Sequence, residues 1–138
     1  MGMGPQPLGY LAFAGVKLAG YTAAGAVLRR KYDAQFLSAL DLGAARTAIG
    51  VAVGLSYGAA WSLFAHFSTG SIAPLFFLLL LPVRLAEWAF LVWWLLDRPL
   101  VRRDLLSQTV GLGTCWSFAL DALGLSFAFV IPGGFWVC

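Results

Sequence analysis

Hydrophobic residues form four long stretches of this chain, and charged residues collect in the segments between them. Each stretch has about the 20 mostly apolar residues that a helix needs to cross a bilayer core about 30 Å thick. Continuous apolar runs, such as Leu75 to Leu81, contradict the alternation of a barrel strand. The pattern predicts an all-α membrane protein, a compact bundle of four transmembrane helices. We expect the helices near residues 8–28, 45–64, 74–96 and 110–131.

Composition supports a membrane address. Of the 138 residues, 61% are hydrophobic and 11% are charged, and the mean hydropathy is +0.85. Soluble proteins average about 45–50% apolar and about 25% charged residues. Four spans with short links use almost the whole length, so residues 1–138 are expected to form one transmembrane domain.

The basic residues predict the orientation of the bundle. They flank the first and third links: Arg29, Arg30, Lys31 and Arg46, then Arg98, Arg102 and Arg103. Residues 1–7, 65–73 and 132–138 contain no Lys, Arg, Asp or Glu. The positive-inside rule then places both basic links in the cytoplasm and both termini outside, in what we expect to be a bacterial inner (cell) membrane. The net charge of +3 comes from this excess of basic residues on the cytoplasmic side. It therefore does not indicate a nucleic-acid partner, and none is expected.

Charged residues also lie inside the apolar stretches. Arg84 follows Pro74 by ten residues and precedes Leu96 by twelve, which places it about 15 Å and 18 Å from the two helix ends. Lys17 and Asp121 are centred in their stretches in the same way, and Glu87 lies one turn after Arg84. A charge at the centre of a spanning helix opposes insertion by about 2.5–3.5 kcal/mol. We therefore expect Lys17, Arg84, Glu87 and Asp121 to meet inside the bundle, where their charges sum to zero.

Neighbouring polar side chains extend this predicted cluster. Arg84 is expected to pair with Glu87 along its own helix or with Asp121 across an interface. Tyr21 follows Lys17 by four residues and Ser117 precedes Asp121 by four, so each shares a helix face with a charge. The indole of Trp88, four residues after Arg84, is in reach of its guanidinium. The candidate ligand or ion path is thus Lys17, Tyr21, Arg84, Glu87, Ser117 and Asp121.

A second pattern lies in the second stretch, where Gly50, Gly54 and Gly58 recur every four residues. Repeated GxxxG spacing lets two membrane helices approach closely. We expect this face to pack against another helix, either of the same chain or of a symmetry-related copy.

Motifs for catalysis and cofactors are missing from the sequence. It has no phosphate-binding glycine loop, no HExxH and no CxxC, and it contains one histidine. We predict no catalytic residue, no metal site and no cofactor, and an enzyme is not favoured.

Three functions fit these observations. The first is a self-associating or accessory subunit of a membrane assembly, with the lipid bilayer and other membrane subunits as its partners. The second is a small ion- or proton-coupled transporter or channel. The third is a membrane enzyme that acts on lipid or quinone.

Overall fold

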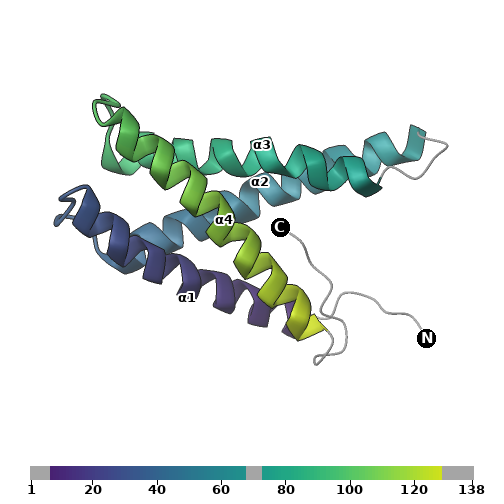
Figure 1. Ribbon diagram of the computed structural model, residues 1–138. Helices are drawn as coiled ribbons and strands as arrows, with labels where there is room; N and C mark the ends of the chain where they lie inside the picture. The colour runs from purple at the N-terminus through teal and green to yellow at the C-terminus, as the bar shows by residue number, and fades with distance from the viewer. Residues whose placement is uncertain (1–6, 68–72, 129–138) are drawn as a thin grey trace.

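The computed structural model describes residues 7–67 and 73–128, and these residues are helical apart from two links (Figure 1). The α-helices are α1 (Pro7–Lys31), α2 (Ala39–Phe67), α3 (Ala73–Leu91) and α4 (Arg103–Ala128). A π-helical segment, η1 (Val92–Leu96), continues α3. The predicted all-α class with four helices is therefore confirmed.

Three of these helices are long and apolar enough to cross a membrane. The candidate spans within the described residues are Leu11–Lys31, Ala39–His66 and Leu78–Leu96. These spans support a membrane-embedded protein. The helix α4, which is expected to be the fourth span, is not among the candidate spans found in the described residues.

Helix α2 begins six residues earlier than the apolar pattern predicts. Ser38 and Asp41 form a capping box at its start, in which the Asp41 amide donates to Ser38 Oγ and the Ser38 amide donates to Asp41 Oδ2, both at 3.0 Å. Hydropathy marks the part of a helix that suits lipid, whereas the cap marks where the helix begins. The extra turns bring Arg46 inside the helix.

The two basic links lie at the same end of the molecule. Arg102 Nη1, at the end of the third link, donates to the carbonyl of Lys31, the last residue before the first link, at 3.3 Å. Tyr32 in the first link reaches α4, where its hydroxyl donates to Thr109 Oγ1 at 3.2 Å. Desolvation by burial raises the pKa of this phenol above its ordinary value. This shared end agrees with the sequence prediction that both links face one side.

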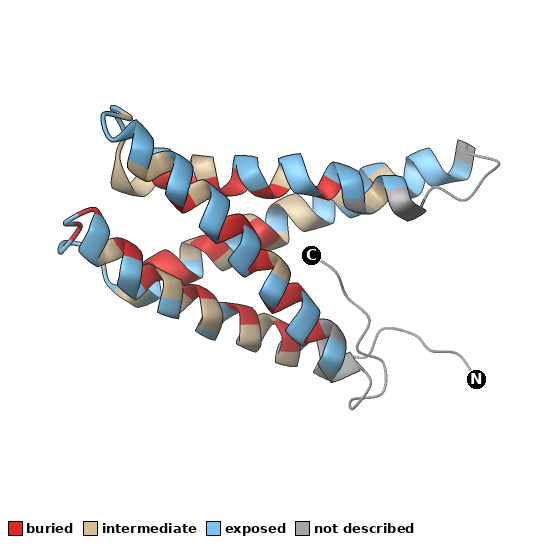
Figure 2. Ribbon diagram, in the orientation of Figure 1, coloured by how far each residue is buried: buried red, intermediate tan, exposed pale blue. Residues whose placement is uncertain are grey.

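The four helices cross near the middle of α4, which runs diagonally over the others (Figure 1). Helix α1 packs mainly against α2, and α4 contacts both α1 and α3. Buried residues concentrate around this crossing, whereas the parts of α2 and α3 beyond it are largely exposed (Figure 2).

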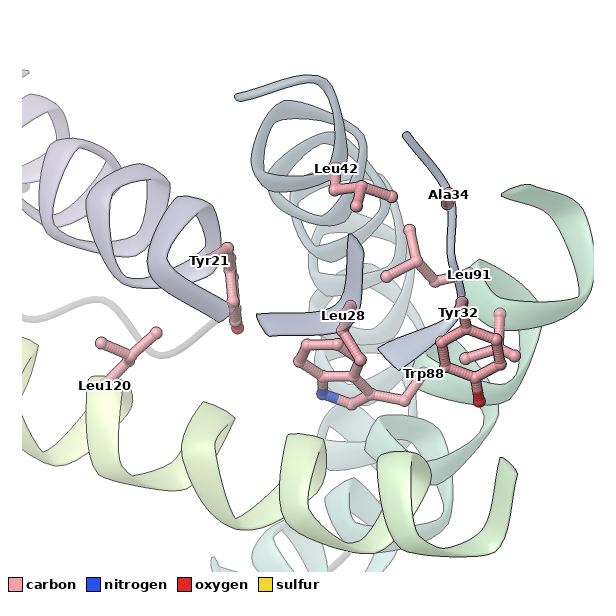
Figure 3. Packing of buried hydrophobic residues seen from close by; sticks show 9 residues of the cluster. Tyr21, Leu28, Tyr32, Ala34, Leu42, Trp88, Leu91 and Leu120 are labelled. Atoms are coloured by element: carbon pink, nitrogen blue, oxygen red, sulfur yellow. The ribbon is translucent and has the colours of Figure 1, made fainter. Parts of the chain in front are cut away.

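Aromatic and aliphatic side chains fill the core beside the crossing. Tyr21, Leu28, Trp88, Leu91 and Leu120 are among its buried members (Figure 3). Glycine allows close contact between the helices, as two positions illustrate. A Cβ on Gly43 would lie 2.7 Å from the Thr22 amide nitrogen, and one on Gly113 would overlap the Trp88 ring. Neither of these glycines belongs to the predicted GxxxG stripe.

Candidate functional site

The structure brings the four predicted charges together. Lys17 Nζ from α1 lies 2.7 Å from Asp121 Oδ1 of α4. Arg84 joins both acids, with Nη2 2.9 Å from Asp121 Oδ2 and Nη1 3.1 Å from Glu87 Oε2. The two pairings that the sequence offers for Arg84 thus occur at once, because the guanidinium presents separate nitrogens to two carboxylates.

A fifth charge, Arg46 of α2, joins the same cluster. Its Nη2 lies 2.6 Å from Glu87 Oε2. The sequence analysis counts Arg46 among the basic residues that flank the first link at the cytoplasmic end of its helix, whereas the structure buries it in the cluster. The early start of α2 places Arg46 seven residues, about 10 Å, inside the helix.

We call Lys17, Arg46, Arg84, Glu87 and Asp121 the charge network. Every helix contributes at least one member, and the ion pairs run from α1 through α4 and α3 to α2. Its charge is +3 − 2 = +1, so the expected sum of zero is wrong as well. The two arginines are each 1% exposed. The network is therefore enclosed and carries one excess positive charge.

Ser117 collects three donors next to the network. Its Oγ accepts from Trp88 Nε1 at 2.9 Å, from the Tyr21 hydroxyl at 3.2 Å and from Arg46 Nη2 at 3.3 Å. The helix-face argument pairs Ser117 with the Asp121 carboxylate, but its hydroxyl is turned to groups on the other three helices. Ser117 is fully buried, so this one small side chain ties α4 to α1, α2 and α3.

Two aromatic rings enclose the guanidinium of Arg46. Its central carbon lies 4.8 Å from the Tyr21 ring centroid and 4.9 Å from that of Trp88. The sequence assigns the Trp88 ring to Arg84 on the same helix, whereas the guanidinium over the ring is that of Arg46. Lys17 Nζ similarly lies 4.5 Å from the Phe13 ring centroid. Such contacts stabilise a desolvated cation because the ring face is negative.

The predicted GxxxG stripe is divided between two environments. Gly50 is buried, and the only groups near its missing side chain are Arg46 and Arg84. Gly54 is partly buried, and Gly58 is exposed with nothing within 4 Å of an added Cβ. A spacing of four residues advances about 40° around a helix. Successive glycines from Gly50 to Gly58 therefore point progressively away from the interface.

The structure places all six predicted path residues at one helix crossing. They are Lys17, Tyr21, Arg84, Glu87, Ser117 and Asp121. What sequence reasoning missed is Arg46, and one signal pointed to it. Arg46 precedes Gly50 by four residues and so shares the inward part of the stripe.

No metal centre is indicated in the part of the chain that the structure describes, where no three His, Cys, Asp or Glu residues are grouped for one. Comparison with protein-family models, with curated proteins and with solved structures finds no match.

Proposed function

We propose that this chain is a small integral membrane subunit that associates with a second copy of itself through α2. In this proposal all four helices span the bilayer of a bacterial inner membrane. The basic links face the cytoplasm and both termini lie outside, in keeping with the positive-inside rule.

The observation that carries the proposal is the poor burial of α2. In its most apolar 18-residue window 6% of residues are buried, compared with 28% in the α1 span and 33% in the α3 span. Leu55 and Leu63 on α2 are 59% and 65% exposed. Of the three candidate spans in the described residues, this one therefore has the smallest share of its apolar window buried.

Gly58 supports contact with a helix at this surface in addition to lipid. Membrane helices associate by close packing, because lipid removes the hydrophobic drive between them. The open space beside Gly58 and its spacing from Gly54 suit the approach of a second backbone. The two copies would then meet along the half of α2 that points away from the crossing.

The charge network supplies the rigidity that this role needs. Burying ion pairs seldom adds stability over apolar packing, but it favours one arrangement of partners over others. Here the ion pairs join all four helices, and no side chain that makes them is more than 10% exposed. The network thereby fixes the angle of α2 relative to the other helices, and so the face that α2 offers to a second copy.

The test uses labelled protein reconstituted in liposomes at low density, with copy number counted by single-molecule photobleaching. Wild-type protein should be dimeric, and Gly58→Ile should lower the association constant by about tenfold or more, because the branched side chain separates the backbones. Gly111→Ile on α4 is the matched control, since Gly111 also has nothing within 4 Å.

Two results would overturn self-association. One is a wild-type protein that is monomeric at every density. The other is an equal loss of dimer in the Gly58 and Gly111 variants, which would indicate a general effect of isoleucine.

Ion or proton transport is a second candidate, because Glu87 and Asp121 are carboxylates held inside the bundle next to three cations. The same liposomes test it with pH-sensitive and potential-sensitive dyes. For a subunit without a path, flux should equal that of protein-free liposomes. Flux that Glu87→Gln or Asp121→Asn abolishes in a folded protein would favour transport instead.

A further inference from the structure

The charge network has more cations than anions, and the excess lies where water has little access. Three basic side chains face two carboxylates, which leaves a charge of +1. An unbalanced charge in a region of low dielectric constant is strongly disfavoured unless a group of opposite sign comes close. The aromatic rings over Arg46 and Lys17 offset part of this cost without removing the charge.

The two arginines also have donors that the described residues do not satisfy. Arg46 Nε, Arg46 Nη1 and Arg84 Nε are buried and have no hydrogen-bond acceptor among the described residues. Each arginine is 99% buried, so these donors cannot turn to bulk water. Unsatisfied donors on a buried guanidinium are costly, and most buried polar groups in proteins do have a partner.

Gly50 leaves the place beside these donors without a side chain. The position where a Cβ would stand on Gly50 lies in tight contact with Arg46 Nη1, at 3.2 Å, and 3.9 Å from Arg84 Nη1. A small cavity between α1 and α2 is lined by Lys17, Tyr21, Thr47 and Gly50 together with the apolar side chains of Phe13, Ala14 and Val51. Lys17 thus lines this cavity, and the two arginines lie beside Gly50, another of its lining residues.

The cavity is of atomic size. The space open to the centre of a water-sized sphere is about 20 Å³. A single water needs about 10–15 Å³ by this measure, so the cavity holds one small species. Tetrahedral oxyanions and carboxylated metabolites are too large for it.

We propose that a small monovalent anion of halide size, such as chloride, binds beside Gly50 between Arg46, Arg84 and Lys17. One such anion brings the network from +1 to zero. It also gives Arg46 Nη1 the acceptor that the described residues do not provide. Tyr21 and Thr47 also line the cavity, with their hydroxyls donated to Ser117 Oγ and to the Gly43 carbonyl. This inference is independent of self-association, since it concerns the interior of one copy.

The test measures unfolding of the detergent-solubilised protein while chloride replaces gluconate at constant ionic strength. A ligand that binds only the folded state raises the ratio of folded to unfolded protein by the factor 1 + [L]/Kd. At a chloride concentration ten times Kd, the ratio should be about elevenfold higher than in gluconate alone.

Two variants assign this effect to the proposed site. Gly50→Ala places a methyl group next to Arg46 Nη1 and should abolish the chloride dependence. Gly111→Ala adds the same methyl group on α4, where nothing lies within 4 Å, and should keep the full dependence. Arg46→Met removes the excess charge and should also abolish the chloride dependence. This second variant tests the site if the Gly50 variant fails to fold.

Bromide-soaked crystals give the direct readout. An anomalous peak in contact with Arg46 Nη1 would support the site. A water there without any bromide, or unfolding that is the same in chloride and gluconate, would overturn it. A chloride effect that survives both Gly50→Ala and Arg46→Met would also overturn it, because the anion would then act elsewhere.

Discussion

The two halves of α2 show opposite relations between polarity and burial. Near the crossing, Arg46 is 1% exposed and takes part in an ion pair. Toward the far end, Leu63 is 65% exposed and Phe64 is 49% exposed. A protein that folds in water places these residue types the other way round. The difference teaches that the interior of this molecule is organised by charges and its exterior by apolar contact.

The far ends of α2 and α3 are joined by a different kind of contact. Tyr57, Trp61 and Phe76 form an aromatic group there, with ring centroids 5.0 Å apart for Tyr57 and Phe76. The Tyr57 hydroxyl donates to the Phe76 carbonyl at 2.7 Å. Ring contacts and the Tyr57 hydrogen bond join the two helices here, whereas ion pairs through all four helices join them at the crossing.

Replacing Arg84 should show most clearly that the crossing and the far ends of α2 and α3 are held by different contacts. Arg84→Met leaves Asp121 and Glu87 with one cation each but removes two hydrogen bonds to their carboxylates. A hydrogen bond to a charged group contributes about 1.5–3 kcal/mol, so a loss of about 3–6 kcal/mol is expected. Chemical unfolding in mixed micelles, followed by circular dichroism, should show a loss of this size.

The neighbouring Leu85→Ala is the control for that measurement. Leu85 is 38% exposed on the same helix, and its truncation should change the unfolding free energy by about 0.5 kcal/mol or less. Equal stability of the Arg84 variant and the wild type would mean that the charge network does not hold the helices together.

Ser117→Ala should have an intermediate effect. It removes the acceptor shared by Tyr21, Trp88 and Arg46, and leaving buried donors unsatisfied costs about 1–3 kcal/mol. The same unfolding assay measures it. Ser56→Ala on the exposed part of α2 is the matched change, because Ser56 Oγ bonds only the Ala52 carbonyl of its own helix. A difference between the two variants below experimental error would contradict the role given to Ser117.

The smallest effect is expected at the start of α2, outside both regions. Ser38 and Asp41 form the capping box there, with two hydrogen bonds of 3.0 Å. Ser38→Ala should lower the unfolding free energy by about 0.5–1 kcal/mol, because replacing a serine N-cap by alanine destabilises the helix by roughly this amount. The same chemical unfolding assay measures it.

Asp41→Ala should lower the stability in the same direction, since it breaks the other half of the same capping box. An unfolding free energy that neither change alters would show that the box does not stabilise the start of α2.

The sequence predicted the all-helical class and placed Lys17, Arg84, Glu87 and Asp121 at one depth in the membrane. Both predictions rest on strong local signals. A run of about 20 apolar residues suits one spanning helix, and charges centred in such runs must find one another because lipid does not solvate them.

Only the tertiary structure decided the membership and the balance of the network. Whether Arg46 lies in a link or in the core depends on where α2 begins and how it is rotated toward Glu87, and hydropathy reports neither. The partners of Ser117 likewise come from the three other helices, and the two rings over Arg46 come from α1 and α3. Periodicity along one helix shows which residues share a face, but the residues that the face meets are set by how the helices cross.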